Sequence, residues 1–101
     1  MTVTPINAVA KVRFSSARAQ RVHLADAGDA KTELLCLEGG QQMTLNGPSS
    51  LVYVISGTGT VLHDSARTTL ATGHLLGIQA DVTLTNLNEQ RLICLLFHTA
   101  S

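Results

Sequence analysis

The chain is a series of short segments in which apolar and polar residues alternate, and each segment is closed by a turn sequence. Residues two apart face the same side of a β-strand, so this alternation predicts strands in preference to amphipathic helices. Glycine, asparagine and aspartate mark the turns, most clearly at Asn46-Gly47-Pro48 and at Thr72-Gly73. The expected strands are residues 10–14, 18–25, 32–38, 41–45, 51–55, 60–63, 67–71, 74–78, 82–87 and 91–98. One helical turn is expected within residues 14–20.

The close and regular spacing of these strands predicts a β-sandwich or closed barrel and argues against a fold of alternating strands and helices. Residues 1–101 are expected to form a single domain, because the length fits one domain and no linker interrupts the pattern. The strongest strand is residues 51–55, which are β-branched, aromatic or aliphatic throughout. Gly57 and Gly59 are expected to break or bend the chain directly after it.

Composition narrows the possible functions. Apolar residues make up 45% of the chain, charged residues 14%, and the formal net charge is zero. No overall field attracts nucleic acid, and no apolar stretch or leader-like segment indicates a membrane or export, so a cytoplasmic protein is expected. Only three aromatic residues are present, which disfavours aromatic platforms for sugars or single-stranded nucleic acid. Low charge on a small β domain with open strand edges favours a homodimer.

Residues that could carry chemistry are few and show no catalytic spacing. Cys36 and Cys94 each lie in an apolar run and are expected to be buried free thiols. The histidines are expected to be hydrogen-bonded residues at strand ends, because none shows the spacing of a metal site. They are His23, His63, His74 and His98. No serine has the sequence context of an activated nucleophile, so no catalytic residue is predicted and an enzyme is not expected.

Three segments together resemble the cupin superfamily. Residues 50–59 are similar to the first cupin motif, commonly written E-x-x-Y-V-L-x-G-x-G. Residues 70–80 are similar to the segment L-x-x-G-D-x-x-x-I-P-A-G, and Thr85-Asn86 with residues 91–93 is similar to the end of the second motif. The resemblance covers residues 31–98. It implies an all-β, cupin-like double-stranded β-helix, a jelly-roll barrel that commonly dimerises and often holds a divalent metal through two or three histidines and a glutamate.

The metal ligands of the family are missing at their own positions. Ser50 occupies the position of the glutamate, and the second-motif histidine falls near residues 82–84. Two spacings are possible for the histidine pair, which falls on Thr44 and Asn46 or on Met43 and Leu45. Divalent transition metals require imidazole, thiolate or carboxylate ligands, so neither a metal nor another cofactor is expected.

The match to the first cupin motif also predicts which residues would line a pocket. Alternation places Ser50, Val52 and Val54 on the inner side of one strand, and three further polar side chains are expected around them. The predicted ligand-binding residues are Thr44, Asn46, Ser50, Val52, Val54 and Asn86. The first hypothesis is a metal-independent module that binds a small organic molecule or has a regulatory role. The alternatives are a barrel filled by its own side chains that acts through a dimer surface, and a divergent cupin metalloenzyme of the dioxygenase or isomerase type.

Overall fold

The structure is a computed structural model that describes residues 5–99, and nearly all of its regular elements are β-strands. The strands are β1 (Gln20–Ala27), β2 (Ala30–Leu37), β3 (Gln42–Leu45), β4 (Ser50–Ser56), β5 (Gly59–His63), β6 (Ala66–Leu70), β7 (Leu75–Ile78), β8 (Val82–Thr85) and β9 (Leu92–Thr99). Most of the predicted strands are therefore confirmed to within two residues of their expected ends.

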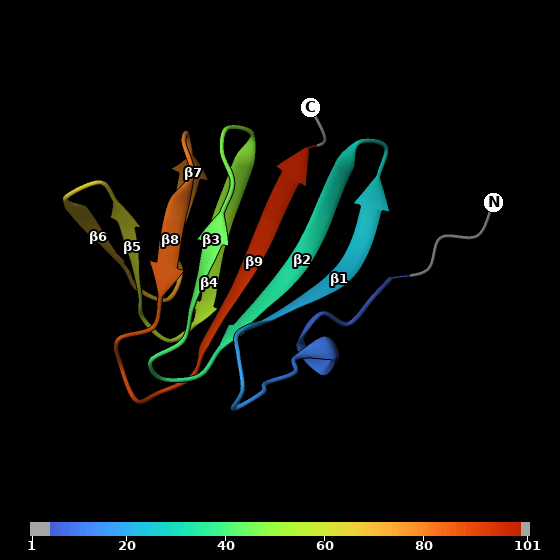
Figure 1. The fold of residues 1–101 in the computed structure, drawn as a ribbon. Helices are drawn as coiled ribbons and strands as arrows, with labels where there is room; N and C mark the ends of the chain where they lie inside the picture. Colours follow the sequence, from blue (N-terminus) through green and yellow to red (C-terminus); the bar gives the residue numbers. More distant parts are fainter. Residues whose placement is uncertain (1–4, 100–101) are drawn as a thin grey trace.

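The strands form two antiparallel sheets that face each other (Figure 1). The larger sheet has the order β1-β2-β9-β4-β7, and the smaller has the order β3-β8-β5-β6. From β2 onward the chain crosses repeatedly between the sheets, with only the β5–β6 hairpin staying in one of them. This repeated crossing is the winding of a jelly roll, so the all-β double-stranded β-helix predicted from the sequence is confirmed.

The inner faces of both sheets are apolar and pack on each other. Val52 and Val54 of β4 are fully buried there, whereas Leu51 and Tyr53 face outward, so the alternation predicted for this strand is confirmed. The buried core is made of Leu35, Leu37, Leu45, Val52, Val54, Val61, Leu70, Ile78, Leu84, Leu92, Cys94 and Leu96. Side chains from every strand except β1 thus fill the space between the sheets.

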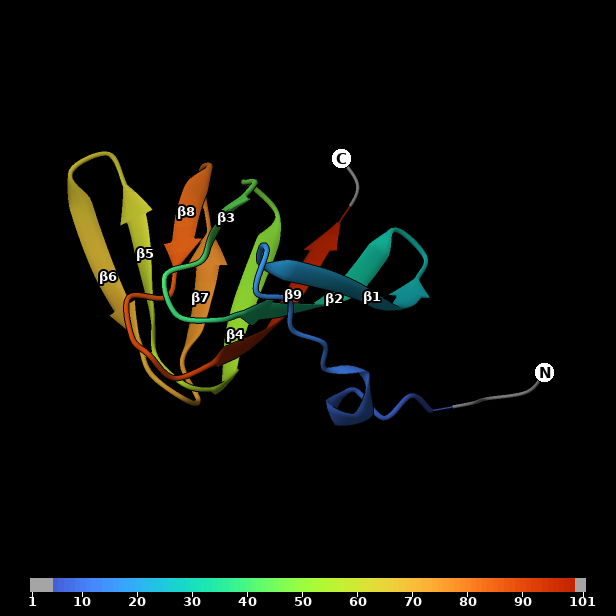
Figure 2. The same ribbon diagram turned by 60° about the horizontal axis from the view of Figure 1, so that its bottom comes forward.

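The segment before β1 differs from its prediction. Residues 10–14 do not form a strand, and the helical turn lies at Val9–Lys11 instead of within residues 14–20. Asn7 favours the earlier turn, because its side-chain oxygen accepts a hydrogen bond from the Ala10 amide at 3.3 Å. The alternation in residues 10–14 has another cause, since this segment lies along the outside of the larger sheet and half-buries Val12 and Phe14 (Figure 2). Within the described residues no helix is long and apolar enough to cross a membrane.

The outer face of β2 is buried as well. Leu34 and Cys36 are fully buried but lie on the opposite side of β2 from the core residue Leu35. The backbone of Arg13 hydrogen-bonds the Cys36 thiol, and Gln41 donates to the carbonyl oxygen of Ser15 at 2.6 Å. Cys94 belongs to the inner core, so the two cysteines lie on opposite faces of the sheet. Both are buried free thiols, as predicted.

The predicted bend between Gly57 and Gly59 is confirmed and separates β4 from β5. Gly57 has a φ of 95°, and a Cβ atom there would lie 2.5 Å from the carbonyl oxygen of Arg91. Both the left-handed backbone and the close approach require glycine at this position.

Candidate functional site

A hollow of about 200 Å³ opens at the end of the barrel where β4 begins and β9 ends. We call it the mouth hollow; it is lined by Arg21, Asn46, Gly47, Pro48, Ser50, Leu96, His98 and Thr99. Three strands of the larger sheet and the turn between β3 and β4 supply these residues. The mouth hollow therefore lies next to the fully buried core, but outside it.

The strand register places a charged group at the side of the mouth hollow. His98 is the direct cross-strand partner of Ser50, and Glu33 is diagonal to His98 across the β2–β9 pair. Arg21 is likewise diagonal to Glu33 across the β1–β2 pair. Diagonal neighbours on one face of a sheet are within reach of long side chains. We call Arg21, Glu33 and His98 the Glu33 cluster.

Hydrogen bonds join the three members of the cluster. Nε of Arg21 donates to Oε2 of Glu33 at 3.0 Å, and Nη2 donates to Oε1 at 3.1 Å. Nε2 of His98 is 2.7 Å from the same Oε1 atom. The side chains of Glu33 and His98 are only 17% and 26% exposed, compared with 39% for Arg21. The carboxylate is therefore the least exposed member of the cluster and is held by both partners.

The hydrogen bond to ionised Glu33 determines which ring nitrogen of His98 carries a proton. Burial acts to raise the pKa of Glu33, but the hydrogen bonds and charge of Arg21, with a smaller contribution from His98, outweigh it and lower this pKa below its usual value. Glu33 is consequently an ionised acceptor at neutral pH, so Nε2 of His98 must carry the proton that joins them. In the neutral imidazole the other nitrogen, Nδ1, is then an acceptor, and no described residue hydrogen-bonds it.

Two predicted ligand-binding residues meet at the mouth hollow. Ser50 is half-buried and donates its hydroxyl hydrogen bond to the carbonyl oxygen of Asn46 at 3.0 Å. Asn46 is exposed at the turn after β3, and its side-chain amide makes no hydrogen bond to a described residue. Both residues are therefore placed where a molecule in the hollow could contact them.

The other predicted residues lie elsewhere. Val52 and Val54 do face the interior, but both are fully buried in the core. Thr44 is exposed on the outside of the smaller sheet, because its neighbours Met43 and Leu45 point into the core. Thr44 therefore does not add the polar tip to the pocket that was predicted for it, since it belongs to the outward set of alternating β3 positions.

Asn86 lies at the opposite end of the barrel from the mouth hollow. It follows β8 directly, whereas Asn46 follows β3, and these two strands are antiparallel partners. Asn86 is fully buried, and its Nδ2 donates to the carbonyl oxygens of Leu37 at 3.1 Å and Gln90 at 2.7 Å. Its Oδ1 accepts a hydrogen bond from the Asn88 amide at 3.1 Å. The side chain is thus used to tie the β8–β9 loop to the end of β2.

The residues at the family's metal positions do not fit a metal. The structure resolves the two possible spacings, because Met43 and Leu45 are the β3 residues that face the interior. Val82 and Leu84 face it from β8, with Ser50 at the start of β4. Thioether, aliphatic and hydroxyl groups are not a ligand set for zinc, iron or manganese. Within residues 5–99, no group of three or more histidine, cysteine, aspartate or glutamate side chains could hold a metal ion.

The histidines other than His98 lie outside the mouth hollow and bond to neighbouring groups. His23 is paired with Asp26 at 2.7 Å, and Nδ1 of His74 accepts a hydrogen bond from the Ala71 amide at 2.9 Å. Nδ1 of His63 is 3.3 Å from the carbonyl oxygen of Asp81. These contacts agree with the expectation of hydrogen-bonded histidines; His63 and His74 lie at strand ends as expected, whereas His23 lies within β1.

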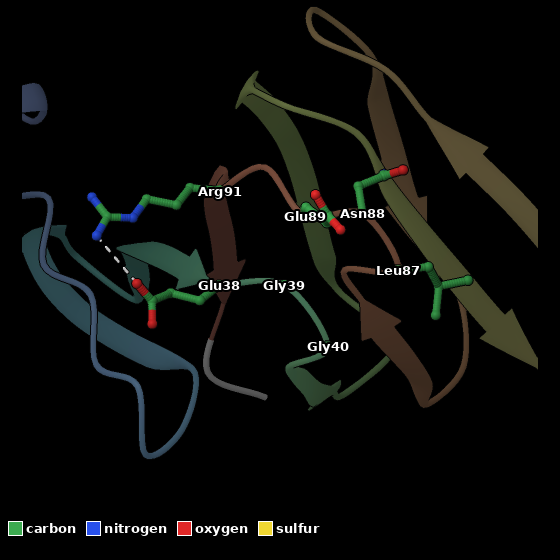
Figure 3. A pocket seen from close by; sticks show the side chains of 7 residues that line it. All are labelled: Glu38, Gly39, Gly40, Leu87, Asn88, Glu89 and Arg91. Carbon is green, nitrogen blue, oxygen red and sulfur yellow. Dashed lines mark hydrogen bonds and ion pairs between the residues drawn. The ribbon is translucent and has the colours of Figure 1, made fainter.

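A larger hollow of about 510 Å³ lies at the end of the barrel opposite the mouth, between the β2–β3 turn and the β8–β9 loop. Figure 3 shows Arg91 paired with Glu38 on one side of it, while Leu87 and Asn88 point away from this pair. The distance between Nη2 of Arg91 and Oε1 of Glu38 is 3.1 Å, and the guanidinium also lies 4.4 Å from the centre of the Phe14 ring. Arg91 thus contacts the N-terminal segment through Phe14, and its pair with Glu38 lies on one side of the hollow, so the charged groups do not converge on one point.

Sequence reasoning missed Arg21 and Glu33, and it treated His98 only as a strand-end histidine. One signal was present, because Glu33 has the same alternation parity as Leu35 and Leu37 and therefore shares their inward face. A carboxylate on an inward face needs a partner, and this need pointed to a polar site.

Comparisons with known proteins bear on the fold. No family model matches this chain, and no curated protein matches it in sequence. A solved structure of an uncharacterized conserved protein with a double-stranded β-helix domain from Klebsiella pneumoniae is similar to it, with a TM-score of 0.82 and 15% identity, covering 97% of this chain and 90% of that one. A cupin superfamily protein from Desulfitobacterium hafniense gives a TM-score of 0.79 at 12% identity, covering 100% and 94%.

A third similar structure is described as a sugar phosphate isomerase of the cupin superfamily from Silicibacter pomeroyi. Its TM-score is 0.71 at 19% identity, and the match covers 84% of this chain but only 61% of that protein. At these identities the comparisons establish that the chain has the cupin fold.

Proposed function

We propose that this chain, which has the cupin fold, is a metal-independent binding module that takes a small organic molecule in the mouth hollow. The observation that supports the proposal is the Glu33 cluster, a partly buried charged group at the edge of an otherwise apolar core. Charged residues at such positions seldom add stability over well-packed apolar ones, because removing them from water is costly. A cluster of this kind beside a concave surface is typical of a binding site.

The size of the mouth hollow limits the ligand. Its volume of about 200 Å³ equals the liquid volume of roughly seven water molecules. It is smaller than most pockets for drug-sized molecules, which begin at about 300 Å³. We therefore propose a ligand with few heavy atoms, bound at the rim and not enclosed within the barrel.

An amide-detected NMR screen with a fragment collection tests this function. We expect binders to shift the amide signals of Asn46, Ser50 and His98. The variant Glu33→Gln should weaken that binding because it removes the charge that holds the cluster. Glu38→Gln is the matched control, since it breaks a similar ion pair at the opposite end of the barrel. The proposal is contradicted if fragments shift only the amide signals of residues at the far end, or if no fragment shifts any signal.

A second candidate function rests on the outer face of the larger sheet. Leu51, Tyr53, Leu75 and Phe97 are 45%, 36%, 60% and 39% exposed there. They adjoin each other, because Leu51 pairs with Phe97 and Tyr53 pairs with Leu75. We propose that this face binds a second copy of the chain, since one apolar patch can meet itself across a two-fold axis and zero net charge removes repulsion between the copies.

Sedimentation velocity tests the dimer. The wild type should sediment as a dimer, and Tyr53→Lys should shift it towards the monomer by placing a charge in the apolar face. Thr69→Lys adds the same charge to the exposed strand β6 of the other sheet and should leave the dimer intact. A wild-type monomer at high micromolar concentration would overturn this candidate.

A further inference from the structure

We infer that the mouth hollow selects small carboxylic acids that carry a hydroxyl group next to the carboxylate. This inference rests on the proposed binding function and names its ligand class. It follows from the hydrogen-bonding groups that the Glu33 cluster leaves available to a ligand.

Arg21 presents an unoccupied edge of its guanidinium group. Glu33 takes the side edge, which consists of Nε and one proton of Nη2. A guanidinium has five N–H donors, so the end edge between Nη1 and Nη2 keeps its donors, and no described residue accepts from Nη1. Two parallel N–H groups on one edge match the two oxygens of a carboxylate.

Glu33 holds this edge in place. It accepts two hydrogen bonds from Arg21, and the pair spans adjacent strands in a diagonal arrangement. A guanidinium held at one edge loses less conformational freedom when a ligand occupies the other edge. Glu33 is thus a positioning residue, and Arg21 makes the contact to the ligand.

His98 supplies an acceptor beside these donors. Its Nε2 proton is directed to Glu33, so its Nδ1 atom accepts in the neutral ring. Arg21 and His98 share the Oε1 atom of Glu33, which brings both side chains to the same wall of the mouth hollow. A ligand bound here needs oxygen acceptors for Arg21 and one O–H donor for His98.

The remaining polar groups of the mouth hollow add both donors and an acceptor. Asn46 contributes an amide, and Thr99 contributes a hydroxyl group. Ser50 already donates to the carbonyl oxygen of Asn46, so its hydroxyl oxygen is left as an acceptor for a ligand O–H group. A hydroxy acid of roughly five to nine heavy atoms satisfies this set within the room available.

Amide-detected NMR titration with three matched probes tests the inference. Lactate carries both groups, propionate lacks the hydroxyl, and lactamide replaces the carboxylate with a neutral amide. We expect lactate to shift the signals of the mouth hollow with a dissociation constant about tenfold lower than that of either analogue, the usual effect of one good polar contact.

Variants separate the two contacts. Arg21→Lys keeps the positive charge but loses the paired edge, and it should remove the preference for lactate over lactamide. His98→Phe keeps a ring but has no acceptor, and Glu33 retains its two hydrogen bonds from Arg21, so this variant should remove the preference for lactate over propionate. Arg91→Lys is the matched control for Arg21 at the far end and should change neither preference.

The outcomes distinguish this inference from the function on which it rests. If lactamide or propionate shifts the same residues as strongly as lactate, the hydroxy-acid inference is wrong and the binding function stands. If lactate binds at the far end, or binds equally to wild type and both mouth variants, the inference is also wrong. If neither these probes nor any fragment perturbs the mouth hollow, both proposals fail.

Discussion

Replacing Asn86 by alanine should destabilise the protein more than any other single polar truncation in the β8–β9 loop. The side chain is fully buried and makes three hydrogen bonds to backbone groups of Leu37, Gln90 and Asn88. Each such bond contributes about 1 kcal/mol net, and each buried group left without a partner adds to the loss. The free energy of unfolding should therefore fall by about 3 kcal/mol, summed over three bonds.

Urea denaturation followed by circular dichroism measures this loss. With a slope of about 1–3 kcal/mol per molar urea, the midpoint should fall by roughly 1–3 M. Asn88→Ala is the matched control, because Asn88 is exposed and its side chain makes one hydrogen bond, to the carbonyl oxygen of Thr58. Asn86→Asp should cost at least as much as Asn86→Ala, since it sets an acceptor against two carbonyl oxygens. An Asn86→Ala loss below about 1 kcal/mol, equal to that of the control, would refute the structural role given to this residue.

Three further predictions concern other parts of the fold. Cys36 and Cys94 should resist iodoacetamide at pH 8 in the native protein and react on unfolding, because burial raises both pKa values, that of Cys94 to about 12; rapid native labelling of Cys94 would contradict its burial. The pKa of Glu33 is lowered by folding, so its contribution to stability is present above its ordinary value of 4.5 and is lost as the pH falls through the lowered value. Glu33→Gln should flatten the acid limb of a stability–pH curve below about pH 4.5, and an unchanged limb would refute this. Gly57→Ala should destabilise the protein more than Gly73→Ala. Both glycines have positive φ, but of the two only Gly57 has backbone atoms within 4 Å of the added methyl group. Equal melting temperatures of the two variants would count against this prediction.

Alternation in the sequence was sufficient to orient the strand at residues 51–55. Val52 and Val54 were placed inside because apolar residues occupy the whole strand and the motif fixed which parity faces inward. The same reasoning left two registers open for β3, since Met43, Leu45 and Thr44 are all compatible with a half-buried strand. The tertiary contacts of Met43 and Leu45 decide between these registers, and a single sequence does not contain them.

The Glu33 cluster depends on pairings that the sequence does not specify. Arg21 reaches Glu33 only because β1 pairs with β2 in the observed register, which shifts between His23 and Ala25. His98 reaches the same carboxylate because β9 lies on the other side of β2. These two contacts bring together residues that are 12 and 65 positions apart, so local patterns could show only that Glu33 faces inward.

The position of β9 has a consequence for how the chain folds during synthesis. This strand is made from residues 92–99, yet it lies at the centre of the larger sheet, with β2 on one side and β4 on the other. The ribosome must therefore release nearly the whole described chain before β2 or β4 can pair with β9. Until then β2 and β4 present apolar residues and unpaired backbone groups, the features that recruit chaperones or lead to aggregation in nascent proteins. The larger sheet is accordingly expected to be completed only after residue 99 has been translated.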